Sequence, residues 1–106
     1  MHIDSGDMIL LQKTSQNLDV VKTPDKLTER ELTRAIRDAI MAEEGAIKQY
    51  ESVVDATDNE IAKKVIQSIA DEEKVHAGEL QKLLNDMLPD EEGFLEDGAK
   101  EVEGEK

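Results

Sequence analysis

Three side chains of metal-binding types stand inside two apolar stripes of the sequence. Between residues 62 and 87, apolar side chains recur in steps of four and three, the spacing of one buried helix face. Glu73 and His76 occupy the two middle positions of this stripe, and Glu43 occupies the middle of a second stripe. The first stripe comprises Ala62, Ile66, Ile69, Glu73, His76, Leu80, Leu83 and Met87, and the second comprises Leu32, Ile36, Ala39, Glu43, Ala46, Tyr50 and Val53.

Buried carboxylates are costly unless an opposite charge accompanies them. Moving an isolated ion into a protein interior costs several kcal/mol even after relaxation. A helix selected for stability alone would carry Leu or Ala at these positions. A divalent cation offsets the cost, because it supplies the opposite charge and binds carboxylate oxygens and an imidazole nitrogen. Two glutamates and one histidine suit iron, manganese or zinc, and they leave coordination positions open for water or oxygen.

Two long helices must position these residues. Thr28 and Glu31 form a capping-box pattern, which predicts a helix over residues 29–55. The turn-forming residues of DATDNE then interrupt the apolar pattern. A second helix is predicted over residues 59–87, because the residue before Pro89 is pushed out of helical geometry. The two helices form an antiparallel hairpin.

The register of this hairpin brings the candidate ligands together. If the turn is centred near residues 57–58, Glu43 and Glu73 are about equally far from it along the chain. They should therefore face each other at one height, with His76 one turn from Glu73 on the same face. Tyr50 lies two turns from Glu43 along the same stripe.

The rest of the chain divides around the hairpin. Residues 1–26 have no sustained period and form a poorly defined N-terminal extension. The hairpin occupies residues 27–89. Residues 90–106 form an acidic tail, in which the pattern allows a short helix near residues 91–95, and we expect the last residues to be mobile.

The predicted hairpin indicates an all-α protein, and its small size indicates that copies of the chain associate with one another. About 60 residues in two helices bury too little apolar surface to be stable alone. Two hairpins can form a four-helix bundle, and a bundle that holds two metal ions needs two Glu residues and two Glu-x-x-His motifs. A symmetric homodimer would therefore complete both the fold and a two-metal site beside its axis.

Composition narrows the function classes. The 106 residues allow one small domain, the absence of cysteine excludes disulfides and thiolate sites, and the aromatic content of 2% calls for an aliphatic core. A net charge of −13 argues against binding to nucleic acid or an anionic membrane. No apolar run approaches the roughly 18 residues of a membrane span, so we expect a soluble, cytoplasmic protein.

The residues alone leave several interpretations open. Glu43, Glu73 and His76 could form a buried polar network that fixes the pairing of helices without metal. Glu72 and His76 could equally form an exposed pair at i,i+4 spacing. The site could also hold zinc or manganese without oxygen chemistry. Tyr50 could be a core aromatic residue or could donate a hydrogen bond to a ligand carboxylate.

Two sequence segments carry a resemblance to a known family. AEEGAIKQY, which contains Glu43 and Tyr50, and DEEKVHA, which contains Glu73 and His76, resemble the two helical signatures of encapsulated ferritins in the ferritin-like superfamily. The resemblance covers about residues 28–88. It implies a ferritin-like four-helix bundle of two chains that oxidises Fe(II) to Fe(III) with dioxygen at a shared di-iron centre. It further implies that Glu43, Glu73 and His76 are catalytic iron ligands, with Glu73 bridging, and that Tyr50 supports the catalytic centre.

The resemblance also implies partners and a location. Encapsulated ferritins assemble into rings, typically decamers, inside an encapsulin shell that stores mineralised iron, so the chain would reside in an encapsulin nanocompartment in the cytoplasm. The sequence departs from the family at Ala42 and Gly45, where members often carry acids of a secondary metal site. Its last residues, EVEGEK, also differ from the apolar, glycine-rich peptide that usually docks cargo into a shell.

Overall fold

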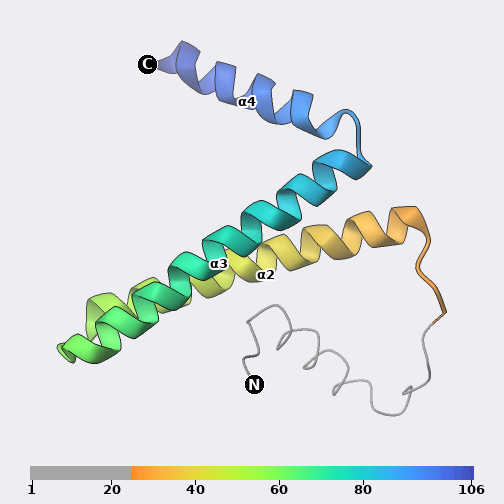
Figure 1. The fold of residues 1–106 in the computed structure, drawn as a ribbon. Coiled ribbons are helices and arrows are strands. Elements are labelled where there is room, and N and C mark those ends of the chain that lie inside the picture. Colours follow the sequence, from red (N-terminus) through yellow and green to blue (C-terminus); the bar gives the residue numbers. More distant parts are fainter. Residues whose placement is uncertain (1–24) are drawn as a thin grey trace.

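Three helices make up residues 25–106, the part of the chain that the computed structural model describes. They are α2 (Glu29–Ala56), α3 (Glu60–Met87) and α4 (Glu91–Glu105), and this part of the chain contains no strand (Figure 1). The predicted all-α class and the two long helices are thus confirmed. The predicted N-terminal extension lies, up to residue 24, outside the described residues.

Both long helices begin where their capping residues predict. The Thr28 Oγ1 accepts a hydrogen bond of 3.1 Å from the Glu31 amide, and the Thr28 amide donates one of 3.0 Å to the Glu31 carboxylate. This confirms the capping box. At the start of α3, the Asn59 side chain accepts from the Ala62 amide at 2.9 Å. These bonds satisfy amides that have no partner within their own helix.

The α2 and α3 helices run antiparallel and pack against each other around a narrow core (Figure 1). Its buried apolar side chains, among the described residues, are Ile36, Ile47, Ala70 and Leu84. The prediction placed Leu83 in the buried stripe, but Leu83 is 47% exposed and Leu84 is 1% exposed. A helix of 3.6 residues per turn drifts against a strict four-and-three repeat, so the buried line has moved by one residue at this end.

One side of the hairpin remains apolar and uncovered. Leu32 and Val53 also belong to the predicted stripe, yet they are 36% and 41% exposed, because α3 covers only one edge of that stripe. At 3.6 residues per turn, several exposed apolar residues of the two helices flank the core on the same side of the antiparallel pair, whereas Met41 and Val75 point away from that side. We call this surface the open apolar face, and it comprises Leu32, Val53, Ile61, Val65 and Leu83.

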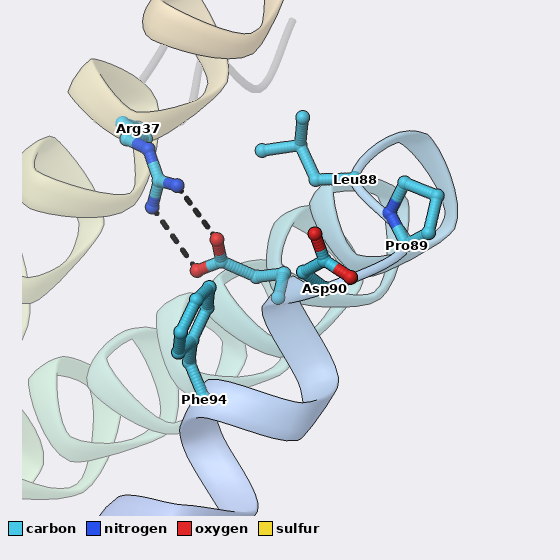
Figure 2. Close-up of a pocket in the computed structure, with 6 residues that line it drawn as sticks. Arg37, Leu88, Pro89, Asp90 and Phe94 are labelled. Atoms are coloured by element: carbon cyan, nitrogen blue, oxygen red, sulfur yellow. Dashed lines mark hydrogen bonds and ion pairs between the residues drawn. The ribbon is translucent and has the colours of Figure 1, made fainter.

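The α4 helix leaves the hairpin at an angle and contains no buried residue (Figure 1). The sequence allowed only a short helix near residues 91–95, but α4 runs for 15 residues. Glu91 and Glu92 in the first turn favour helix formation, because acids there interact well with the helix dipole. A bidentate ion pair ties the start of α4 to α2: Arg37 donates hydrogen bonds of 2.7 Å and 3.2 Å to the Glu91 carboxylate (Figure 2).

We predict that this ion pair makes the docking of α4 sensitive to acid. The hydrogen bonds from Arg37 lower the pKa of Glu91 below its usual value of 4.5. The contact therefore stabilises the docked helix above about pH 4.5 and is lost as the pH falls through the lowered pKa. Arg37→Gln should raise the pKa of Glu91 toward 4.5 and speed amide exchange in α4 at neutral pH, both measurable by NMR.

The Lys106→Gln variant is the matched control for this titration. It removes the exposed ion pair between Lys106 and Glu103 at the far end of the same helix. The pKa of Glu91 should be unchanged in it. An equal effect of both substitutions would show that Arg37 does not hold α4.

Candidate metal centre

The middle of each long helix presents a buried glutamate to the other helix. Glu43 on α2 is 3% exposed, and Glu73 on α3 is 1% exposed. The turn at residues 57–59 sets the register that brings them to one height. The structure therefore confirms that these two carboxylates face each other inside the hairpin.

His76 completes a compact group of three ligand-type side chains. One ligand atom from each of Glu43, Glu73 and His76 lies within 4.8 Å of the other two. The Nδ1 atom of His76 is 3.6 Å from Oε2 of Glu73, one helical turn away. The His76 side chain is 31% exposed, so the group opens to the surface on the side of the imidazole.

The spacing and chemistry of this group fit a first-row metal ion. Two atoms bound to one such ion at about 2.0–2.2 Å can be no more than about 4.4 Å apart. Small side-chain rotations would therefore bring all three atoms to bonding distance. Two carboxylates and one imidazole form a donor set for iron, manganese or zinc, and three ligands from one chain leave coordination positions unfilled.

The ion pairs of Lys74, the lysine beside Glu73, are with acids of the surface. Lys74 follows Glu73 in sequence, but its Nζ lies 3.1 Å from Glu51 and 3.4 Å from Asp71, both on the exposed surface. These two ion pairs raise the pKa of Lys74, chiefly through the hydrogen bond to Glu51. Lys74 therefore pairs with acids of the surface and not with the buried carboxylates.

The other residues considered from the sequence lie around this group. Tyr50 is half-buried on α2, about 10 Å from Glu43 along the helix axis at 1.5 Å per residue. Glu72 and Glu44 are exposed, and Gly45 has open space beside it on the surface. Of the residues considered from the sequence, the hairpin brings Glu43, Glu73 and His76 together in one group.

Sequence reasoning missed a hollow beside the turn between α3 and α4. It has a volume of about 270 Å³ and is lined by Arg37, Leu88, Pro89, Asp90, Glu91 and Phe94 (Figure 2). Arg37 and Glu91 are 54 residues apart in the chain, so only the clustering of arginines early in α2 could have drawn attention to this region. The hollow is smaller than the roughly 300–1,000 Å³ of sites that enclose drug-sized ligands.

Residues 25–106 contain no helix that is long and apolar enough to cross a bilayer.

Comparison with a family model and with a solved structure identifies the same fold. The model described as Rubrerythrin matches residues 34–106. A crystal structure of the encapsulated ferritin domain from Pyrococcus furiosus superposes with a TM-score of 0.78 and 33% sequence identity. The match covers 83% of this chain and 90% of that domain. The ferritin-like fold inferred from the sequence is confirmed.

Two curated proteins are also similar in sequence. The encapsulin nanocompartment cargo protein EncC of Myxococcus xanthus is 39% identical over 77 residues, which are 73% of this chain and 59% of that protein. A ferritin-like-encapsulin shell fusion protein of Pyrococcus furiosus is 34% identical over 88 residues, which are 83% of this chain and 26% of that protein. The chain thus spans just over half of the first relative and about a quarter of the second. Together with the crystal structure, they establish that the chain belongs to the encapsulated ferritins, with a ferritin-like domain of the rubrerythrin family.

Proposed function

We propose that this protein is a ferroxidase that oxidises Fe(II) with dioxygen at a di-iron centre formed between two chains. The observation that carries the proposal is the group of Glu43, Glu73 and His76, two buried carboxylates and an imidazole within bonding range of one ion. Membership of the encapsulated ferritins supports iron as the metal. Iron is both the ion held by the ligands and the substrate that is oxidised.

The position of His76 supports a site that is shared by two copies. The imidazole lies at the edge of the open apolar face, between Val65 and Leu83 along the same side of α3. A second hairpin placed on this face would cover the apolar side chains and bring its own Glu43, Glu73 and His76 to the same place. Four carboxylates and two imidazoles form the ligand set of a di-iron bundle. Dimerisation thus completes the core and the site together.

The chain's residues would perform distinct tasks in the oxidation. Glu43, Glu73 and His76 would hold the iron, and Glu73, whose Oε2 lies 3.6 Å from the His76 imidazole, would serve as the bridging carboxylate. Each Fe(II) gives up one electron, so a pair reduces one dioxygen to hydrogen peroxide when two protons are taken up. The carboxylates balance the added positive charge on Fe(III), which favours the oxidised pair. In the dimer, the aliphatic side chains of the two open apolar faces would exclude bulk water from the centre.

Tyr50 would act as a supporting residue beside the centre. It is half-buried on the α2 stripe that carries Glu43. Its hydroxyl can donate a hydrogen bond toward a ligand carboxylate and hold that carboxylate's orientation. A second copy on the open apolar face would enclose this side chain together with the site.

The relatives support a role in iron storage inside a protein shell. One is an encapsulin cargo protein, and another is fused to an encapsulin shell. We therefore propose that the dimers assemble further, into a ring, within an encapsulin nanocompartment in the cytoplasm, where Fe(III) accumulates as mineral.

Removing a ligand carboxylate should abolish iron oxidation. We expect the wild-type protein to bind about one Fe(II) per chain without oxygen and to develop ferric absorbance quickly in air. Glu43→Gln and Glu73→Gln should each slow this oxidation by at least about 100-fold, because loss of groups that only orient ligands already costs about 10–100-fold. Anaerobic titration followed by stopped-flow absorbance measures both quantities.

The matched control is Glu44→Gln, which makes the same chemical change at the exposed neighbour of Glu43. It should bind and oxidise iron like the wild type. If the wild type takes up no iron while its oligomer persists, the three residues are a structural network. If it binds the ion but air produces no ferric absorbance, the site is a metal store without oxygen chemistry.

A charge on the open apolar face should break the dimer. Val65 is 52% exposed on this face, and Val65→Glu would place an unpaired charge in the interface at a cost of about 3 kcal/mol or more. The dissociation constant of the dimer should rise at least about 100-fold. Light scattering coupled to size-exclusion chromatography measures the mass, and far-UV circular dichroism measures the accompanying loss of stability.

The Met41→Glu variant is the control, because Met41 is 68% exposed on the side of α2 that lies opposite the open apolar face. It should remain associated at the same concentration. Equal masses and equal thermal stabilities of the two variants would contradict association through the open apolar face.

A further inference from the structure

Each of the two long helices contains one glycine, which follows a candidate iron ligand by two residues. Gly45 is the only glycine of α2 and follows Glu43, and Gly78 is the only glycine of α3 and follows His76. Both helices continue unbroken through these positions. At 3.6 residues per turn, two residues span about 200° around the helix axis. Each glycine therefore lies behind its ligand, on the opposite side of the helix, where it is exposed.

No contact within the described residues explains a glycine at either position. A Cβ atom added at Gly45 or Gly78 would meet no atom within 4 Å. Alanine therefore fits at both positions, and the chain uses alanine at the adjacent positions Ala46 and Ala77. A glycine inside a helix lowers the equilibrium constant for helix formation by about fivefold relative to alanine. The hairpin thus carries two destabilising residues, both beside its ligands, although its core is small.

The proposed reaction requires the ligands to move more than their side chains allow. The ligand atoms of Glu43, Glu73 and His76 lie within 4.8 Å of one another, and small rotations suffice to bind one ion. A pair of ions about 3.5–4 Å apart needs other ligand spacings, which change again when Fe(III) leaves. Glu43 and Glu73 are 3% and 1% exposed, so their packed neighbours restrict larger rotations. The backbone that carries the ligands has to share the movement.

We propose that Gly45 and Gly78 are positioning residues that let the ligand-bearing turns flex while iron is bound, oxidised and released. Glycine has access to more backbone conformations than any other residue. Helical hydrogen bonds on the side that faces water also lengthen more readily than those on the buried side. A bend at Gly45 moves Glu43 relative to the centre, and a bend at Gly78 moves His76. The inference rests on the proposed function, because it concerns the movement of the same ligands.

The test replaces each glycine by alanine in the full chain. Gly45→Ala and Gly78→Ala each add one methyl group that faces away from the ligands, so an effect on iron has to pass through the backbone. Each variant should keep the mass and the anaerobic Fe(II) content of the wild type. The midpoint of thermal unfolding should rise by about 4–8 °C in each, because alanine favours the helix.

Two rates report the movement itself. Without iron, amide hydrogen exchange at residues 42–46 in Gly45→Ala and at residues 75–79 in Gly78→Ala should slow by about fivefold. In air, ferric absorbance should develop about fivefold more slowly in each variant, because the flexed turn is less populated. In the double variant the effects should multiply to about 25-fold, since the two glycines lie on different helices.

The matched control is Gly98→Ala, which makes the same change in α4, where an added Cβ atom also meets no atom within 4 Å. It should slow hydrogen exchange in α4 and leave the rate of iron oxidation unchanged.

The other outcomes separate the glycines from the ferroxidase. A stabilised alanine variant that oxidises iron at the wild-type rate would overturn the proposal, as would unchanged hydrogen exchange at the ligand-bearing turns. A lower mass would overturn it in favour of a close contact between copies at that glycine. Less Fe(II) bound at the wild-type mass would also overturn it, because the glycine would then shape the site and not its movement. A wild type that binds Fe(II) but forms no ferric product would instead contradict the ferroxidase, and slower exchange in the alanine variants would still support flexible ligand turns.

Discussion

The burial of two carboxylates at one height between two helices is the constraint on which the rest of this structure depends. Glu43 and Glu73 occupy positions that an aliphatic core would fill with leucine, and each buried charge costs several kcal/mol when it is alone. A cation bound between them offsets that cost only if the register of the hairpin is correct. The end of α2 at Ala56 and the Asn59 cap of α3 bound the turn that sets this register.

The small core links the same site to the apolar surface beside it. Four buried apolar side chains are few for a hairpin of two 28-residue helices, and the apolar surface beside them is uncovered. If a second hairpin covers that surface, the metal ligands of two chains converge, and binding of the ion and association of the chains are coupled. By linkage, iron then strengthens the dimer by the same factor by which the dimer strengthens iron binding.

The sequence predicts the parts of this protein that depend on local chemistry. The capping box at Thr28, the turn before α3 and the stop at Pro89 are local signals, and the turn fixes the height of Glu43 relative to Glu73. Which side of each helix is buried depends less on local sequence, because the other helix selects it by packing. Leu83 was placed in the core because it continues the repeat, but packing against α2 selects Leu84.

Elements that depend on distant residues could not be predicted. The Arg37–Glu91 pair joins residues 54 apart, and no local pattern in either segment requires it. The length of α4 is the second case, because glycines at 93, 98 and 104 mark the segment as a weak helix former. Its acids at the N-terminus and the anchor to Arg37 act against that tendency.

The distribution of charge gives the chain two surfaces of different character. With a net charge of −13, copies of this protein repel one another unless specific contacts overcome the repulsion. Apolar residues dominate one side of the hairpin, around His76, and the arginines gather on the other side, at the start of α2. Apolar burial is insensitive to salt, whereas contacts between arginines and carboxylates weaken as salt screens them. If copies associate through both surfaces, salt would weaken the contacts at the arginines and would leave the apolar contact around His76 intact.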